Sequence, residues 1–318
     1  MQKIKSQTSE LPSGQASLKE ASILLTGATG FIGRNVAEEL LKRGYKVFAI
    51  SNSTLLPEMK NLVQIQLNLF EKESVEKFLE ENRFEDLIHL AWYTGEKCHS
   101  SEVNLDWMAL SLSLLKSFQK NGGKRVLFAG SMSEYDFSYG YLKEDLTPLK
   151  NPSLYGKCKS SLFEIASTFA KQTGMDFKWA RVFNLYGPYE KPNRLMPYVI
   201  CSILKKEEVR VSACTKTQDY LHVYDTANAI VKLFESEVQG AVNISSGIPI
   251  KLKVIVEKIS ELMNYKGKIF YGAIPTNFED EFVVGCNDRL TQDVGWAQKY
   301  DLEEGLKQTI KWWRQNNV

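Results

Sequence analysis

The sequence predicts an α/β fold, a Rossmann-type doubly wound parallel sheet followed by a smaller C-terminal α/β substrate domain. Three observations predict it. Short apolar runs alternate with helical patterns from Ser22 to about Val182, the arrangement of βαβ units in a parallel sheet. A glycine-rich turn directly joins the first strand to the first helix. Beyond about Asn184 the alternation weakens, and shorter helices mix with short strands.

The elements follow in chain order. Hydrophobic periodicity and turn residues predict strands at 23–25, 46–50, 63–67, 87–91, 125–129 and 177–182, with helices at 32–42, 73–81, 102–120 and 153–173. The later region is predicted to hold helices near 194–206, 224–235, 251–263 and 302–316, and short strands near 209–212, 241–244 and 268–271. We expect right-handed crossovers in the main sheet.

Composition excludes several classes of protein. Lys and Arg number 40 against 38 Asp and Glu, a net charge of +2 that is too balanced for a nucleic-acid binder with a basic face. The sequence has no stretch of about 18 apolar residues without a charge, so no membrane-spanning helix is predicted. The five cysteines form no CxxC pair and the three histidines have no metal-ligand spacing, so we expect free thiols, no metal and a cytoplasmic protein.

The glycine-rich turn is Gly27-Ala28-Thr29-Gly30-Phe31-Ile32-Gly33. Its glycines permit a tight turn, close approach to a pyrophosphate and close helix–strand packing, and the helix N-terminus attracts anions. The alternative is a tight turn without a ligand. The predicted dinucleotide contacts here are Gly27, Thr29, Gly30, Phe31, Ile32 and Gly33.

The end of the second strand bears on the choice of dinucleotide. Ser51, Asn52 and Ser53 stand where NAD sites usually carry Asp or Glu. Arg34 could pair with a 2′-phosphate, although an exposed helix arginine is the alternative. We therefore favour NADP(H), with NAD(H) as the alternative.

Tyr155 and Lys159 lie four residues apart, on one face of a predicted helix. A nearby ammonium lowers the pKa of a phenol and makes it a better acid–base catalyst at neutral pH. Two other YxxxK matches, at Tyr93 and Tyr139, fall in predicted loops. Ser131 follows the fifth strand, where ligands bind in such sheets, and could hold a substrate carbonyl against Tyr155.

Together these residues resemble the extended short-chain dehydrogenase/reductase family, and specifically its nucleotide-sugar branch, from about Ser22 to Trp313. Besides the glycine turn, Ser131 and the Tyr155–Lys159 pair, the matching stretches are Ile88–Ala91, Val103–Asn104, Tyr135, Arg181–Pro188, Asp219–Asp225 and Asn243–Gly247. The resemblance implies a catalytic triad of Ser131, Tyr155 and Lys159. It also implies further cofactor contacts at Asn68, Leu69, Leu90, Ala91, Tyr155 and Lys159, and substrate contacts at Asn104, Ser133, Asn184, Arg194 and Lys216, where an exposed arginine at a helix start is the alternative for Arg194. Trp92 and Tyr93 follow the fourth predicted strand and could line the sugar pocket as further substrate contacts, with packing as the alternative.

The departures from the family pattern narrow the chemistry. The 4,6-dehydratases of the resembled branch carry an Asp-Glu pair after the catalytic hydroxyl residue, and its carboxyl groups run the elimination of water. This chain has Met132-Ser133 there, so dehydration is not expected. Gln218 stands where many members have an arginine that pairs with a phosphate, with Lys216 close by. Whether Glu134 faces substrate or solvent stays open from sequence.

Residues 1–20 are predicted to form a flexible extension, 21–183 the dinucleotide-binding domain with 213–236 packed back on it, and 184–318 the substrate-binding domain. The predicted activity is NAD(P)H-dependent reduction of a nucleotide-linked 4-keto-6-deoxyhexose. A nucleotide-sugar 4-epimerase with tightly bound NAD is the alternative, and a non-catalytic dinucleotide-binding scaffold is a minor one. The resemblance implies a homodimer formed through helices 102–120 and 153–173.

Overall fold

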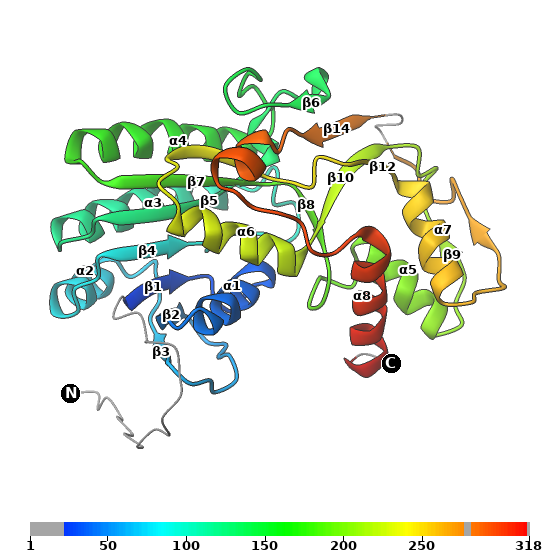
Figure 1. Ribbon diagram of the computed structural model, residues 1–318, viewed down its shortest axis with the longest axis horizontal. Helices are drawn as coiled ribbons and strands as arrows, with labels where there is room; N and C mark the ends of the chain where they lie inside the picture. The colour runs from blue at the N-terminus through cyan, green and yellow to red at the C-terminus, as the bar shows by residue number, and fades with distance from the viewer. Residues whose placement is uncertain (1–21, 277–280, 317–318) are drawn as a thin grey trace.

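The computed structural model describes residues 22–276 and 281–316 (Figure 1). The predicted extension at 1–20 lies outside these residues. A seven-stranded sheet of order β11-β7-β5-β4-β1-β2-β3 forms the centre, and every neighbouring pair in it is parallel. Its strands are β1 (Ser22–Thr26), β2 (Lys46–Ser51), β3 (Leu62–Gln66), β4 (Asp86–His89), β5 (Arg125–Ser131), β7 (Asp176–Val182) and β11 (Gly240–Ile244).

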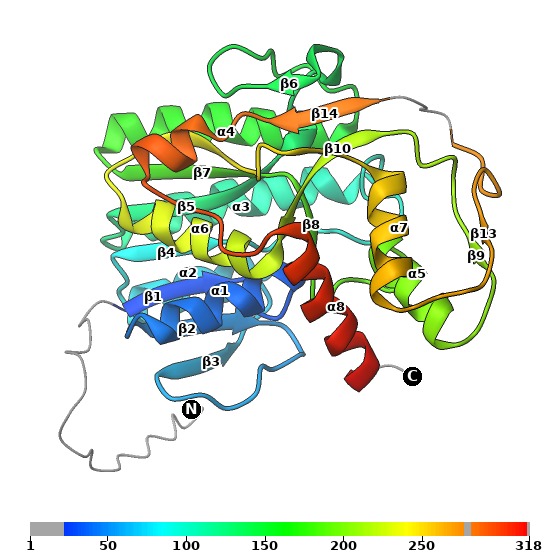
Figure 2. The same cartoon turned by 45° about the vertical axis from the view of Figure 1, so that its right-hand side comes forward.

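Helices cover both faces of this sheet (Figures 1 and 2). One face carries α1 (Phe31–Lys42) and α6 (Val223–Glu235), and the other carries α2 (Lys72–Glu81), α3 (Val103–Lys120) and α4 (Leu154–Thr173). Because both faces are buried, the central strands are apolar runs rather than alternating ones. The predicted fold class, a Rossmann-type parallel α/β sheet, is confirmed.

Local chemistry sets the ends of the long helix α4. The Ser153 hydroxyl accepts a hydrogen bond from the Gly156 amide at 3.1 Å and so caps the first turn. Gly174 ends the helix in the left-handed conformation, with φ of +70°, which glycine adopts without steric cost. This capping places Tyr155 in the first turn of α4, at the carboxyl end of the sheet.

A smaller region follows the carboxyl ends of the parallel strands (Figure 2). Its larger sheet has the order β12-β10-β14-β6, with β8 also paired to β10, and a two-stranded sheet joins β13 to β9. The strands are β6 (Tyr141–Leu142), β8 (Asn184–Tyr186), β9 (Val209–Arg210), β10 (Thr217–His222), β12 (Pro249–Lys251), β13 (Ile269–Phe270) and β14 (Phe282–Gly285). Three helices, α5 (Leu195–Leu204), α7 (Leu252–Leu262) and α8 (Leu302–Asn316), share a separate core.

One strand lies elsewhere than the sequence pattern placed it. The strand near 241–244 was expected in the smaller region, but β11 pairs in parallel with β7 as the edge of the main sheet. The reason is that α6 packs against α1 on the main sheet, where Asn228 donates to Glu39 at 2.8 Å and Arg43 pairs with Glu235. The chain that leaves α6 is therefore already beside the open edge of β7.

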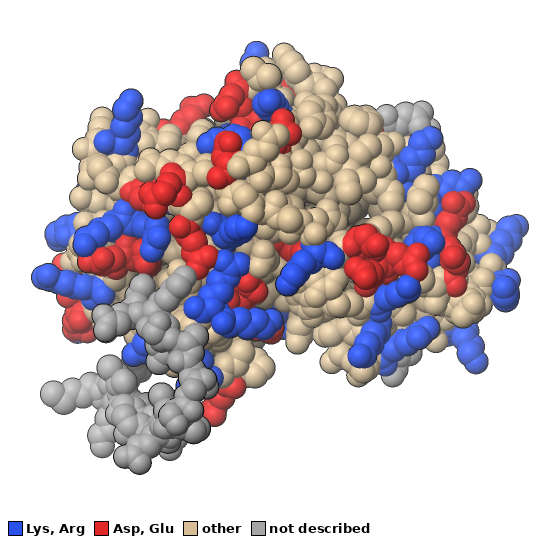
Figure 3. Space-filling model, viewed as in Figure 1, with Lys and Arg blue, Asp and Glu red and all other residues tan. Residues whose placement is uncertain are grey.

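On the face shown in Figure 3, basic and acidic side chains lie interspersed over both regions. In the part of the chain that the structure describes, none of the helices combines the length and apolarity needed to cross a membrane. Among residues 22–276 and 281–316, no group of three or more His, Cys, Asp or Glu side chains is placed to hold a metal ion.

Candidate active site

A cavity of about 780 Å³ lies between the carboxyl ends of the parallel strands and the smaller region. The register of the sheet explains its position, because Thr26 at the end of β1 pairs with Ile50 on one side and His89 on the other. The loops that leave these strands therefore begin at one edge. Ligands bind at this edge in doubly wound sheets.

The glycine turn forms one wall of the cavity. Gly27 has φ of +72°, and a Cβ on Gly33 would lie 2.0 Å from the Gly27 carbonyl oxygen, so both positions require glycine. The first N–H groups of α1 have no partner within the helix, no side chain caps them, and the first turn has no acidic residue. This cradle of free N–H groups fits a dinucleotide pyrophosphate.

The structure brings most of the predicted cofactor residues into the cavity wall. Those present are Gly27, Thr29, Gly30, Phe31, Ile32, Gly33, Leu90, Ala91, Tyr155 and Lys159. The remaining five do not line it. Ser51 and Asn52 lie at the end of β2, and Asn68 and Leu69 follow β3, so these four residues lie along the same edge of the sheet. The Arg34 guanidinium donates to the Thr29 carbonyl oxygen at 2.9 Å and stacks on the Tyr189 ring at 4.0 Å.

Ser131, Tyr155 and Lys159 meet in the opposite wall. Ser131 is the last residue of β5, and its hydroxyl lies close enough to the Tyr155 phenol to lower the pKa of that phenol. Lys159 Nζ donates to the Ala129 carbonyl oxygen at 2.8 Å and lies 3.6 Å from the centre of the Trp92 ring. The predicted triad thus forms one contiguous group, with Trp92 holding the lysine by a cation–π contact.

The electrostatics of the triad differ from the sequence argument. Burial raises the pKa of Tyr155 to about 12 and outweighs the opposing effect of the nearby Ser131 hydroxyl. Burial lowers the pKa of Lys159 to about 7, because desolvation disfavours the ammonium. We expected Lys159 to lower the pKa of Tyr155, but in the structure the lysine is directed to Ala129, and the phenol keeps its proton at neutral pH.

Of the predicted substrate contacts, two line the cavity. Asn184 donates to the Asp219 carbonyl oxygen at 3.2 Å, and Arg194 stands at the start of α5. The other four do not line the cavity. Asn104 is buried behind the wall, and Ser133 is buried below Gly156. The Tyr93 hydroxyl donates to the Glu96 carbonyl oxygen, and Lys216 pairs with Glu281 at 3.0 Å.

Asn104 has a different use from the one expected. Its Oδ1 accepts from the Trp92 indole at 2.9 Å, and its Nδ2 donates to the carbonyl oxygens of Cys98 and Ser101, both at 2.7 Å. All of these bonds are internal, so the amide has no need of a ligand. Asn104 therefore orients Trp92, which in turn contacts Lys159.

Several wall residues escaped the predicted set, namely Thr94, Trp107, Glu190, Lys191, Asn193, Gln218 and Tyr220. Trp92, which directly follows the fourth predicted strand, was expected either to line the pocket or to pack, and it lines the wall. Glu190 gave no signal, since it lies in an irregular loop whose path over the cavity depends on tertiary contacts. Burial raises the pKa of Glu190 to about 8, and its Oε2 has no hydrogen-bond partner among the residues that the structure describes.

The parallel sheet, the glycine turn and the Ser–Tyr–Lys group define a dinucleotide-binding protein of the short-chain dehydrogenase/reductase class. Residues 23–245 match the profile of the NAD dependent epimerase/dehydratase family, and the chain belongs to that family. The resemblance found in the sequence is thereby confirmed.

Individual relatives cover nearly the whole chain. CDP-abequose synthase of Salmonella muenchen is 23% identical over 91% of this chain and 96% of its own length. The dTDP-6-deoxy-L-talose 4-dehydrogenase (NAD(+)) of Aggregatibacter actinomycetemcomitans is 28% identical over 83% and 98%. The crystal structure of UDP-glucose 4-epimerase from Thermotoga maritima with UDP-glucose superimposes with a TM-score of 0.84 at 25% identity, over 93% of this chain and 100% of the other.

Proposed function

We propose that the chain is an NAD(P)H-dependent reductase of a nucleotide-linked 4-keto-6-deoxyhexose. The observation that carries the proposal is that Ser131, Tyr155 and Lys159 line the same cavity, with a phenol that keeps its proton at neutral pH. A protonated phenol is the form required to donate a proton to a ketone oxygen as it is reduced. The related dTDP-6-deoxy-L-talose 4-dehydrogenase is named for the reverse reaction at the same sugar position.

Each residue then has a defined task. A nicotinamide dinucleotide held by the Gly27–Gly33 turn supplies the hydride when bound. Ser131 donates a hydrogen bond to the C4 oxygen of the sugar, and Tyr155 transfers its proton there. Lys159 binds the nicotinamide ribose from the same wall. The proposal excludes 4,6-dehydration, because Met132 and Ser133 offer no carboxyl group for the elimination.

We also propose the remaining features that the sequence predicted. NADP(H) is favoured because neither Ser51 nor Asn52, at the end of β2, is a carboxylate. Asn52 is exposed, and within the described part of the chain the buried Ser51 hydroxyl has no hydrogen-bond partner. Asn184 and Arg194 in the smaller region would contact the substrate diphosphate. A homodimer through α3 and α4 agrees with the half-exposed Leu105 and Ile165 on those helices.

The first test identifies the dinucleotide. Freshly purified protein is denatured, and the released nucleotide is analysed by mass spectrometry. An empty site or NADP(H) supports an exchanging cofactor and hence the reductase. Stoichiometric NAD contradicts it and favours a 4-epimerase, which retains and recycles its cofactor.

The second test measures turnover of 4-keto-6-deoxy sugar nucleotides with NADPH. Tyr155→Phe is expected to lower kcat by about 10²–10⁴, the usual contribution of a general acid. Tyr139→Phe is the matched control, since Tyr139 has the same spacing to Lys143 but lies exposed on a short 3₁₀ turn. Full turnover by Tyr155→Phe refutes the mechanism. Dinucleotide binding without turnover of any such substrate favours a non-catalytic scaffold.

A further inference from the structure

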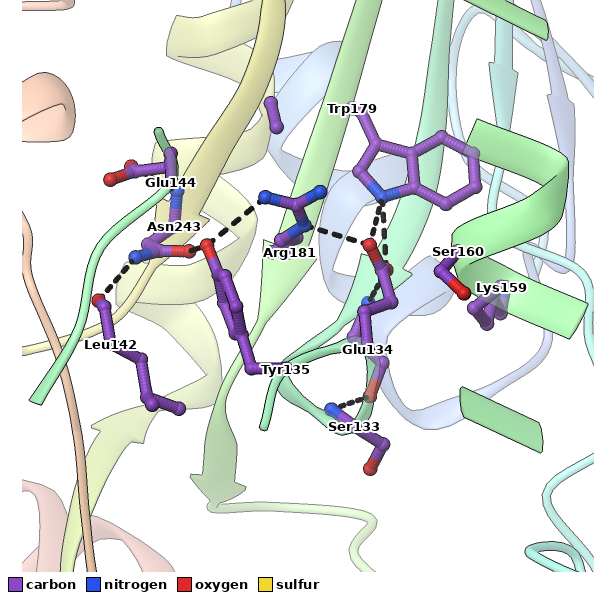
Figure 4. A network of polar contacts seen from close by, with 12 residues as sticks. Ser133, Glu134, Tyr135, Leu142, Glu144, Lys159, Ser160, Trp179, Arg181 and Asn243 are labelled. Carbon is purple, nitrogen blue, oxygen red and sulfur yellow. Dashed lines mark hydrogen bonds and ion pairs between the residues drawn. The ribbon is translucent and has the colours of Figure 1, made fainter. Parts of the chain in front are cut away.

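Glu134 lies three residues after Ser131, and the sequence left open whether it faces substrate or solvent. It faces neither. Its side chain is 0% exposed and lies at the centre of a network of polar contacts (Figure 4). A carboxylate so deeply buried is costly unless donors surround it.

Three donors surround the Glu134 carboxylate. The Arg181 Nε donates at 2.7 Å, the Trp179 indole donates to the two oxygens at 3.0 and 3.1 Å, and the Ser131 backbone amide donates at 2.7 Å. Arg181 is itself 1% exposed, so the two charges neutralise each other inside the protein. The third donor ties this buried pair to the residue that bears the catalytic hydroxyl.

The contact with Ser131 is reciprocal within one turn. The Ser131 hydroxyl oxygen accepts a bond from the Ser133 amide at 3.2 Å while Glu134 accepts from the Ser131 amide, which is a capping box. Because the amide of Ser133 occupies a lone pair of the hydroxyl, the hydroxyl proton stays available to donate toward the cavity.

Close packing fixes this turn against its surroundings. A Cβ on Gly130 would lie 2.1 Å from the Trp179 indole nitrogen and 2.6 Å from a Glu134 oxygen. A Cβ on Gly156 would lie 2.0 Å from the Ser133 carbonyl oxygen, which shows how tightly the turn meets α4 next to Tyr155. The turn therefore has little freedom to move while Glu134 holds it.

We propose that Glu134 is a positioning residue that fixes the Ser131 hydroxyl against the Tyr155 phenol. The inference rests on the proposed role of Ser131 in polarising the substrate carbonyl. Loss of the carboxylate frees the Ser131 amide and lets the hydroxyl leave its productive direction. The cost appears in kcat more than in KM, because Glu134 does not contact the cavity.

The test is a double-mutant cycle in the full-length enzyme. Ser131→Ala is expected to lower kcat about 10²–10³-fold, as loss of one oxyanion donor does. Glu134→Gln is expected to lower kcat about tenfold, because its amide can accept from Ser131 or from Arg181 but presents a donor to the other. In the double variant the Glu134→Gln change should cost nothing more, since coupled residues are not additive.

Two further variants keep the test sharp. Trp179→Phe is the substitute test in case Glu134→Gln does not fold. It keeps the ion pair between Glu134 and Arg181 but removes the indole donor, and it should lower kcat by a few fold. Tyr135→Phe is the matched control: its hydroxyl lies in the same network, donating to Asn243 at 2.8 Å and accepting from Arg181 at 3.1 Å, but does not touch Ser131. It should lower the melting temperature and leave kcat unchanged.

The outcomes separate the two claims. If Ser131→Ala loses turnover but Glu134→Gln does not, or if their losses add, the positioning role is refuted while the proposed function stands. An equal kcat loss in Tyr135→Phe refutes it as well, since any damage to the network would then suffice. If Ser131→Ala keeps full turnover, the proposed role of Ser131 and this inference both fail.

Discussion

Replacing His89 tests how the buried end of β4 responds to acid. The ring is 3% exposed, and burial together with the nearby Lys159 lowers its pKa to about 3. Ser111 donates its hydroxyl proton to Trp107, so it accepts from His89 Nε2 at 2.9 Å, and Nδ1 then accepts from Thr26 at 2.7 Å. The neutral ring satisfies both contacts, whereas an imidazolium would face the Thr26 hydroxyl with a second donor.

The sign and size follow from linkage. Below pH 6.5 this histidine is protonated in the unfolded chain, but in the folded chain it stays neutral until about pH 3. The free energy of unfolding therefore decreases as pH falls through this window. The loss is about 1.4 kcal/mol per pH unit, or about 5 kcal/mol over the whole window. That is comparable to the total stability of many domains.

The assay is urea unfolding of wild type and His89→Gln at intervals from pH 7 to 4.5. We expect His89→Gln to be less stable at pH 7, because it loses packing against Phe128, and to lose less stability on acidification, by about 1.4 kcal/mol per unit. Ser111→Ala is the control: it removes a partner of the ring but no titratable group, so its pH dependence should follow that of wild type. Parallel curves for wild type and His89→Gln would refute the argument.

Three other predictions concern the cavity wall. Gly33→Ala should abolish dinucleotide binding and cost about 1–3 kcal/mol, because its Cβ meets backbone atoms of Gly27 that cannot rotate away; fluorescence titration with NADPH and chemical unfolding check this. Glu190→Gln should be more stable than wild type above pH 8, and this gain in stability should shrink toward pH 4.5. The reason is that the folded wild type keeps the Glu190 proton until about pH 8, whereas the unfolded chain releases it near pH 4.5. Thermal unfolding across this range measures the difference, and a difference independent of pH would contradict the prediction. Asn104→Ala should cost about 1–3 kcal/mol and lower kcat, because Trp92 loses its buried partner, and an unchanged kcat would show that Trp92 does not depend on that bond.

Sequence patterns predicted the main sheet well because its signals are local. The apolar runs and helix periods of the first half lie close to β1–β5, β7 and α1–α4, and the glycine turn needed no tertiary information. The place of β11 could not be predicted, since a short apolar run does not reveal which sheet edge will receive it. That choice depends on the packing of α6 against α1, more than one hundred and eighty residues apart in sequence.

For the active site too, local motifs were predictable from sequence, and contacts between separate elements were not. Ser131, Tyr155 and Lys159 were predictable from motif and order, and the structure places them together. Their supporting contacts were not, because Trp92 meets Lys159 only through the packing of separate elements, and the donors that hold the Glu134 carboxylate under Ser131 come from another strand. Asn104 shows the converse case: its position in a motif suggested a ligand contact, while its three internal bonds assign it to the support of the wall.

The late return of β11 affects how the protein can be synthesised. A growing chain that has completed β7 exposes the outer edge of that strand, with its backbone N–H and C=O groups unpaired, until Gly240–Ile244 leaves the ribosome. The whole segment between Val182 and Gly240 must be made during this interval. A fragment that stops at Val182 therefore carries an open parallel edge prone to pairing with other chains, and a gene truncated there yields an aggregation-prone half rather than a free-standing nucleotide-binding module.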